Sequence, residues 1–529
     1  MTRTIGIDLG TTNSCVATIG ADGIPVIINN KQGETTTPSV VSFVDAAEGG
    51  SRSVIGSPAR RMAVTNPDQT IHGVKRFIGR RFEDEEVQAL ARTLSYQLAP
   101  APNGDAWVRV GGIAMSPQEI SALLLAELRT IAEQHFTGEV TEAIITVPAH
   151  FDNEQRKATK DAATIAGLKV RRLLNEPTAA ALGFGAHRSE DKRYAVCDLG
   201  GGTFDVSIVN VEDGLIEVIS TDGDLFLGGD DVDRAIIVAL VDEFRAEQGI
   251  DLFDDPTALQ RLNGEVRTAK HTLSEATVAT MSLPYLSETE AGKRIDYKRT
   301  FMRRELETWA APLIDRLEAP CLAALARCGL KASQVDAIIL VGGMTRMPSV
   351  QAKISSIFGR PPLKVVNPDE IVSIGAATQA AILDGTVEGV VLLDVTSRAI
   401  GLSTNEQRYQ QVIAKSAAVP TREHKIVSTT EDGQRELSID VYEGEFPNPH
   451  DNRHLGRFVL GNLPDGRAGE VMLLVEFTVD VDGILRVSAS DMATGRRPEL
   501  RMVATAGLSR LEVSRMINSM ADARKAGLV

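Results

Sequence analysis

Cysteine is scarce in this chain, and the four cysteines lie far apart. Cys15, Cys197, Cys321 and Cys328 form no CxxC pair and have no paired histidine ligands beside them. A disulfide framework or a zinc site needs grouped ligands, so the sequence argues against both. Scattered cysteines of this kind fit a reducing compartment, and we expect a cytoplasmic protein.

Long apolar runs and an excess of positive charge are also missing. The longest apolar runs, residues 122–128 and 337–344, are far shorter than the roughly 20 residues of a membrane-spanning helix. The N-terminus, MTRTIGIDLG, lacks a basic start followed by a sustained apolar stretch, so we expect no signal peptide. A net charge of −15 disfavours sequence-independent binding to nucleic acid. We therefore expect neither a membrane nor a nucleic acid among the partners.

Apolar residues are plentiful enough for several cores, because 43% of the 529 residues are hydrophobic. This length predicts about three or four domains. Up to residue 385, strand and helix patterns alternate, which predicts an α/β architecture with largely buried sheets. The expected strands are 4–9, 16–19, 143–147, 194–197, 206–211 and 335–341, and the expected helices include 117–135 and 313–325.

The pattern changes near residue 386. Apolar and polar residues alternate over 437–441 and 473–481, and Asp482-Gly483 marks a hairpin turn, so residues 397–507 predict an antiparallel β-sandwich. A capping box at Ser509 then predicts one short helix with an apolar stripe and no partner. We divide the chain into an α/β domain (1–386), a linker (387–396), the β domain (397–507) and the C-terminal helix (508–529).

Two copies of one motif are the strongest chemical signal. Residues 7–14 (IDLGTTNS) and 196–205 (VCDLGGGTFD) both follow a predicted strand and lead into another. Glycine and small hydroxyl residues allow backbone N–H groups to approach phosphate oxygens, and the aspartate at the strand end can hold Mg²⁺ through its waters. An ordinary glycine-rich hairpin explains one copy, whereas two matched copies favour a phosphate site.

Two further glycine turns can serve the same ligand. The segment 342–346 (GGMTR) follows a buried strand and could hold an adenosine ring, with the planar arginine stacked on the base. Gly228-Gly229 precedes a helix whose N-terminus favours phosphate, although Asp230-Asp231 would oppose this unless they face away.

These motifs resemble those of the DnaK-type heat-shock chaperones of the seventy-kilodalton class. IDLGTTNSCV, VPAHFDNEQRKATKDA, NEPTAAALGFG, DLGGGTFDVS, LGGDDVD and ILVGGMTRMP occur in that family's order and spacing. VVLLDVT, IAKSAAVPT and VDVDGILRVSASD continue the likeness through the β domain. The resemblance implies an actin-like, two-lobed α/β ATPase domain, then an antiparallel β-sandwich that binds extended apolar peptides. The family normally adds a helical lid, and in its place we expect only the one short C-terminal helix.

The resemblance also implies ligands and site residues for ATP or ADP, Mg²⁺ and K⁺. The implied catalytic residues are Lys75, Glu176, Asp198 and Thr203, and the implied metal residues are Asp8, Asp198 and Asp205. The implied nucleotide-binding residues are Gly10, Thr11, Thr12, Asn13, Gly200, Gly201, Gly202, Thr203, Gly228, Gly229, Arg267, Lys270, His271, Ser274, Gly342, Gly343, Arg346 and Asp369. Lys75 stands in a basic run that would otherwise indicate a solvated face.

Coupling and peptide binding are implied in the same way. The implied relay and coupling residues, which include positions that receive a J-domain co-chaperone, are Pro148, Arg156, Arg172, Asn175, Leu392 and Asp394. The implied peptide-binding residues are Leu402, Asn405, Val427, Thr430, Leu437 and Ile439.

The chain departs from the family at several of these positions. Arg267 stands where the family usually has a glutamate that reaches the ribose, which could weaken nucleotide binding by about 1 kcal/mol. His150 replaces a tyrosine, and we expect it to be buried with its hydrogen bonds satisfied. The residues that arch over the peptide, Asn405 and Thr430, are polar, so the grip on peptide should be weaker.

The leading hypothesis is an ATP-hydrolysing chaperone that binds and releases unfolded polypeptide, aided by a J-domain co-chaperone and a nucleotide exchange factor, and acts as a monomer in the stress response. A sugar or acetate kinase and a polymerising actin-like protein share the expected core, but neither needs a tethered β domain. A nucleotide-gated scaffold with reduced client binding also stays open, because of the polar arch.

Overall fold

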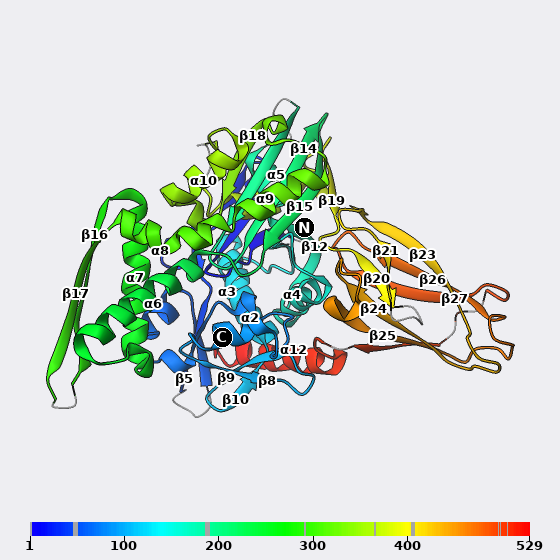
Figure 1. The fold of residues 1–529 in the computed structure, drawn as a ribbon, viewed down its shortest axis with the longest axis horizontal. Helices are drawn as coiled ribbons and strands as arrows, with labels where there is room; N and C mark the ends of the chain where they lie inside the picture. The colour runs from blue at the N-terminus through cyan, green and yellow to red at the C-terminus, as the bar shows by residue number, and fades with distance from the viewer. Residues whose placement is uncertain are drawn as a thin grey trace.

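The computed structural model describes residues 3–45, 51–185, 191–289, 292–363, 367–403, 408–495, 497, 499–504 and 506–528. It has a mixed α/β fold with several sheets (Figure 1). The expected peptide-binding residue Asn405 lies outside the described residues. None of the described helices combines the length and the apolar character needed to cross a membrane.

The first large sheet has the strand order β12-β11-β1-β2-β3. Its strands are β12 (Lys169–Asn175), β11 (Glu142–Val147), β1 (Thr4–Asp8), β2 (Asn13–Ile19) and β3 (Pro25–Ile27), and β4 (Thr37–Pro38) pairs with β2. Strand β1 is parallel to β11 and antiparallel to β2. Helices α3 (Pro117–Phe136) and α4 (Asn153–Ile165) contribute to the core beside this sheet, and both begin with a capping box.

The second large sheet repeats this arrangement. Its order is β18-β13-β14-β15-β19-β22, formed by β18 (Ala337–Val341), β13 (Lys192–Leu199), β14 (Phe204–Glu212), β15 (Leu215–Asp224), β19 (Val391–Val395) and β22 (Ala418–Val419). Strand β13 is parallel to β18 and antiparallel to β14, just as β1 stands between β11 and β2. Helices α5 (Glu176–Phe184) and α11 (Ile371–Leu383) pack together between the two sheets. The two copies of the sequence motif therefore occupy matching places in two sheets.

Two helices, α6 (Gly229–Gln248) and α7 (Pro256–Glu275), share a core with the second sheet. The strands β16 (Val278–Glu288) and β17 (Arg294–Met302) form a separate hairpin sheet, which projects at the far left of Figure 1. The helix predicted over 313–325 is broken into α8 (Arg303–Asp315) and α9 (Glu318–Arg327). Pro320 explains the break: proline lacks the N–H for an interior helical bond, but fits the first turn of α9.

Smaller elements complete the first part of the chain. They are β5 (Val40–Asp45), β6 (Ser51–Ile55), β7 (Thr70–His72), β8 (Gln97–Pro100), β9 (Ala106–Val110), β10 (Ile113–Met115), α1 (Ser57–Met62), α2 (Glu85–Ala91), α10 (Pro348–Phe358) and the short 3₁₀ turns, of which η2 (Val74–Arg76) and η6 (Gly343–Arg346) border the site.

The C-terminal part forms two antiparallel sheets that share one apolar core. One contains β21 (Tyr409–Ile413), β20 (Ile400–Ser403), β24 (Leu437–Glu443), β25 (Arg453–Gly461) and β28 (Glu499–Ala504), and the other contains β23 (Thr421–Ser428), β26 (Met472–Val479) and β27 (Leu485–Asp491). We call this part the β region. The predicted hairpin around Asp482-Gly483 is present between β26 and β27.

The last helix, α12 (Arg510–Lys525), has a partner, contrary to the sequence prediction. Met520 is buried and Val513, Met516 and Ile517 are partly buried against the core beside the first large sheet. Arg524 pairs with Glu133 of α3 at 3.0 Å. The helix runs beneath the first sheet's helices in Figure 1. The apolar stripe is confirmed, but its partner lies almost 400 residues away in the chain, which periodicity cannot reveal.

Candidate functional site

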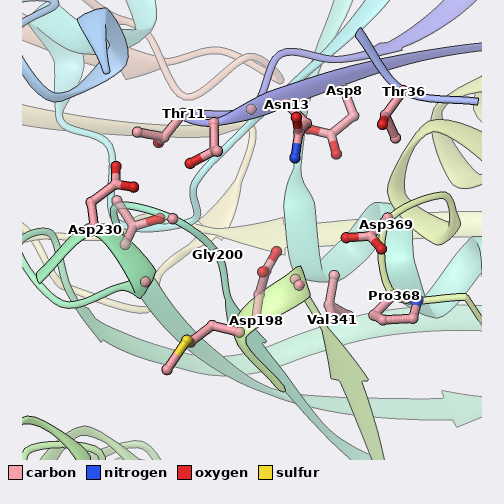
Figure 2. A pocket seen from close by; sticks show the side chains of 18 of the residues that line it. Asp8, Thr11, Asn13, Thr36, Asp198, Gly200, Asp230, Val341, Pro368 and Asp369 are labelled. Atoms are coloured by element: carbon pink, nitrogen blue, oxygen red, sulfur yellow. The ribbon is translucent and has the colours of Figure 1, made fainter. Parts of the chain in front are cut away.

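A cavity of about 160 Å³ lies between the two large sheets and is lined by both glycine-rich turns. Figure 2 shows Asp8 and Asp198 on opposite walls, with Asp230 and Asp369 toward the two ends. The predicted residues that line it are Asp8, Gly10, Thr11, Thr12, Asn13, Lys75, Glu176, Asp198, Gly200, Gly201, Thr203, Gly229, Arg267, Lys270, His271, Ser274, Gly342, Gly343 and Asp369.

The two turns owe their places to strand pairing. Asp8 ends β1, and in the second sheet Asp198 pairs with Asp205 across β13 and β14, so the connection is the tight turn 200–203. The backbone N–H of Gly200 donates to the Thr203 carbonyl at 3.1 Å and closes that turn. A Cβ on Gly201 would lie 1.9 Å from Oγ1 of Thr12, so the two turns touch and only glycine fits there.

The third turn approaches the same place because β18 runs parallel to β13, with Val341 beside Asp198. Gly342 has a φ of +82°, and a Cβ on it would lie 2.3 Å from the Leu199 carbonyl oxygen. Glycine is required at this position by both the backbone conformation and the close approach.

Carboxylates from both walls of the cavity surround a single ammonium group. Nζ of Lys75, in η2, lies 2.6 Å from Oε1 of Glu176, and both side chains are about 9% exposed. Burial raises the pKa of Glu176 to about 7 and that of Asp8 to about 6, while Lys75 lowers both. Burial also raises the pKa of Asp198 well above its usual range, and Glu176, Asp205 and Asp8 raise it further. The solvated-face interpretation of Lys75 is wrong, because its side chain is buried.

This excess of carboxylates fits a cation. One oxygen of Asp205, Oδ2, is buried and has no hydrogen-bond partner among the described residues, while Oδ1 accepts the backbone N–H of His150 at 3.0 Å. No group of three or more Asp, Glu, His or Cys side chains in the described ranges is arranged to hold a metal ion directly. Carboxylate oxygens are the ligands that Mg²⁺ prefers, usually with several waters retained.

His150 is buried as expected, but its hydrogen bonds are not all satisfied. Its Nδ1 lies 3.7 Å from Asp205 and has no hydrogen-bond partner in the described part of the chain. The sequence could not show this, because Asp205 comes from the other sheet.

The opposite end of the cavity is lined by α7 and by the start of α6. Arg267 binds Asp230 at 3.0 Å and Asp233 at 3.2 Å, and Lys270 lies 2.7 Å from Asp233. Asp230 therefore faces the cavity and is neutralised by Arg267, whereas Asp231 pairs with Arg76 instead. Lys270 also donates to the Gly229 carbonyl at 2.8 Å, which links the two helices.

Four of the predicted nucleotide- and metal-binding residues do not line the cavity. Gly202 and Gly228 are packed so closely that a Cβ on either would clash with a neighbouring segment, and Asp205 is buried. Arg346 is about half exposed and binds Asn367 at 2.8 Å and Asp369 at 2.7 Å. The expected stacking of Arg346 over a base is therefore not preformed.

Sequence reasoning missed Arg60, Thr36 and Pro368, which line the cavity. Arg60 lies in the short helix α1 and donates to Oδ1 of Asn13 at 2.8 Å. Its only sequence signal is the pair Arg60-Arg61 after Pro58, which resembles any exposed basic turn.

Three of the six predicted coupling residues, Arg156, Asn175 and Asp394, meet at the junction between the first sheet and the β region. Arg156 is buried and donates to Asn175 at 2.8 Å and to the Asp482 carbonyl at 3.4 Å. Asp394 accepts from Thr178 at 3.0 Å and, with Arg156 and Asn175, lines a small cavity there. Pro148 follows β11, Arg172 lies half-buried in β12, and Leu392 in β19 pairs with Ile216 of β15.

Of the predicted peptide-binding residues, Leu402, Leu437 and Ile439 are buried in the core of the β region, and Val427 is partly buried against it. Thr430 is exposed, and its backbone N–H donates to Oε1 of Gln434 at 2.7 Å. The buried residues stabilise the two sheets in this arrangement.

One comparison with known proteins gives the family. The family model described as "Hsp70 protein" matches residues 4–527 of the 529-residue chain. The match spans both large sheets, the β region and α12. The glycine-rich turns and the carboxylates around Lys75 therefore all lie within the matched residues. This chain is a member of the Hsp70 family.

Proposed function

We propose that this chain is an ATP-dependent chaperone whose nucleotide binds in the cavity between the two large sheets. Members of the Hsp70 family hydrolyse ATP with Mg²⁺ and work with unfolded clients, J-domain proteins and exchange factors. The observation that carries the proposal for this chain is the buried Lys75–Glu176 pair in one cavity with Asp8 and Asp198. Asp8 comes from the first large sheet and Asp198 from the second.

In this proposal the region up to residue 386 is an actin-like, two-lobed ATPase domain. The two turns donate backbone N–H groups to phosphate oxygens, aided by the hydroxyl groups of Thr11, Thr12 and Thr203. Thr12 has a buried Oγ1 with no hydrogen-bond partner among the described residues, as expected for a group that awaits a ligand. Ser274 and His271 at the other end then border the adenosine.

Lys75 is proposed to position the attacking water and to stabilise charge that develops on the transferred phosphoryl group. Glu176 holds the ammonium group in place through the 2.6 Å contact. Asp8, Asp198 and Asp205 would hold Mg²⁺ through its waters, with K⁺ nearby. When bound, Mg²⁺ supplies positive charge that neutralises the phosphate oxygens.

The β region, residues 397–507, is proposed to be a β-sandwich that binds extended apolar peptides, with residues 387–396 as the linker. The contacts of Arg156 and Asp394 support a route by which nucleotide binding changes peptide affinity. Arg172, Asn175 and Asp394 would receive the J-domain co-chaperone at the same junction. We propose that the protein acts as a cytoplasmic monomer in the stress response.

The ATPase rate of the purified chain tests this function, measured with Mg²⁺ alone, with a J-domain protein, and with an unfolded polypeptide. Slow basal hydrolysis that both additions stimulate is the expected result. Phosphate transfer to a sugar or to acetate would instead identify a small-molecule kinase. Hydrolysis that neither addition changes would leave an ATPase without the proposed coupling to clients and would contradict the chaperone proposal.

A further inference from the structure

Cations from both sides of the cleft meet at the adenosine end of the cavity. Arg60 comes from α1 beside the first sheet, and Arg267, Lys270 and His271 come from α7 beside the second. All four line the same cavity. A ligand that enters this end is therefore met by basic groups from two directions.

The carboxylates at this end do not neutralise all of these cations. Arg267 and Lys270 occupy Asp230 and Asp233 with three contacts of 2.7–3.2 Å. Arg60 donates to the neutral amide oxygen of Asn13 at 2.8 Å. Glu34 and Asp230 also attract Arg60, but Glu34 accepts hydrogen bonds from Ser57 at 2.8 Å and from Asn30 at 3.2 Å, and Asp230 is paired with Arg267. Arg60 thus makes no ion pair within 4 Å among the described residues that the structure shows.

Burial and the nearby cations both act on the basic groups around this end of the cavity. Burial and then the charge of Arg267 lower the pKa of Arg60, and the same two causes lower the pKa of His72 to about 4. Burial and then Lys270 lower the pKa of His271. Two arginines that repel each other across a cleft are stabilised when an anion lies between them.

The geometry of Arg267 suits such an anion. Its two ion pairs, one from Nε and one from Nη2, fix the guanidinium plane before any ligand binds. A fixed planar guanidinium is preorganised for phosphate, because little side-chain entropy is lost on binding. A neutral ribose hydroxyl would interact with this guanidinium more weakly than a charged phosphate.

Resting on the proposed function, we infer that the site prefers adenine nucleotides that carry an additional phosphate ester on the ribose, bound between Arg60 and Arg267. With the 5′-phosphates at the glycine-rich turns and the base near Ser274, the ribose lies between these ends. Its 2′- and 3′-oxygens are then the atoms nearest the two arginines. Both positions present the same phosphate monoester chemistry, and the experiment separates them.

Isothermal titration calorimetry of the full chain with Mg²⁺ compares ADP with 2′-phospho-ADP and 3′-phospho-ADP. We expect one of the two phosphorylated nucleotides to bind at least about ten-fold more tightly than ADP, as a new charge-assisted contact should give. The preference should shrink as salt concentration rises.

Three variants locate the effect. Arg267→Gln and Arg60→Ala, from α7 and α1, should each remove most of the preference, measured as the ratio of the ADP affinity to that of the phosphorylated nucleotide in the same variant. Arg61→Ala is the matched control, because Arg61 neighbours Arg60 in α1 but does not line the cavity, and it should keep the preference.

The outcomes separate this inference from the proposed function. Equal affinity for ADP and both phosphorylated nucleotides overturns the inference alone and shows that Arg267 serves only Asp230 and Asp233. A preference that survives in both Arg267→Gln and Arg60→Ala overturns it as well. Failure to bind ADP in any form overturns the proposed function and the inference with it.

Discussion

The carboxylate of Asp482, in the turn between β26 and β27, lies 2.5 Å from Nζ of Lys160 in α4. Its other oxygen accepts the backbone N–H of Leu173 in β12 at 2.9 Å. One buried side chain of the β region thus joins a helix and an edge strand of the first large sheet. Asn153 adds to this junction by donating to Glu443 at 3.3 Å and accepting from Leu485 at 2.9 Å.

Asp482→Ala should weaken this junction. The change leaves the N–H of Leu173 unpaired in a buried place, which costs about 1–3 kcal/mol. Energy transfer between dyes on α3 and β21 should fall as the two parts separate. Asp465→Ala is the control, because Asp465 pairs with the exposed Arg435 within the β region. Equal signals in both variants would show that Asp482 does not hold the junction.

Docking of the β region on the first large sheet should weaken as pH rises, because of Glu443. Burial raises the pKa of Glu443 to about 7 in the docked structure, and Asp152 raises it further, against Arg398 and Arg453. A carboxyl whose pKa is raised on docking favours docking in its protonated form. That contribution is fully present below its ordinary pKa of 4.5 and is lost as pH rises toward 7.

Glu443→Gln should therefore flatten the pH dependence of the same energy-transfer signal between about pH 5 and 8. Glu436→Gln, an exposed position in the β region, should leave the dependence as it is. A docked fraction that rises with pH in the unaltered chain would contradict the expected direction of the effect.

Lys75→Ala should keep nucleotide binding and lose turnover by roughly 10²–10³-fold, as expected when one group that stabilises transition-state charge is removed. Single-turnover hydrolysis and titration with ADP measure the two effects separately. Lys31→Ala, which alters an exposed lysine paired with Glu127, should match the unaltered chain. Near-normal turnover in Lys75→Ala would refute the catalytic role.

The linker offers a control within one strand. Leu392 packs against the core between the sheets, whereas Val391 is 57% exposed. Leu392→Asp should undock β19 from β15 and abolish the effect of ATP on peptide affinity, whereas Val391→Asp should change it little. Domain coupling of this kind is worth about 1–3 kcal/mol. An intact ATP effect in Leu392→Asp would make the linker a simple tether.

Helix α12 should detach when its buried side is altered. Met520→Asp removes a buried side chain worth about 1.5–3 kcal/mol, and hydrogen exchange of the α12 amides should then become faster. Leu511, on the same helix, is 61% exposed, so Leu511→Asp should leave exchange nearly unchanged. Similar exchange in both variants would show that the contact with the first sheet's core is not stabilising.

Local patterns determined much of this protein. The capping boxes at Ser116 and Ser509 start helices where the sequence predicts them, because the N-cap side chain accepts the N–H of the residue three positions later, within the same turn. The strand-turn-strand motifs likewise follow from glycine and alternating apolar residues that are close in the chain. The break between α8 and α9, before Pro320, shows the limit of periodicity when a proline interrupts an otherwise helical stripe.

Only the tertiary structure decided which of these pieces meet. It placed Lys75 against Glu176, 101 residues away, and so turned an apparently solvated basic run into a buried ion pair. It gave α12 its partner, brought Asp230 into the cavity opposite Arg60, and left Arg346 outside. Charge and burial at these places depend on side chains from distant strands and helices, and the free energy of each contact is set by that packing rather than by neighbours in the sequence.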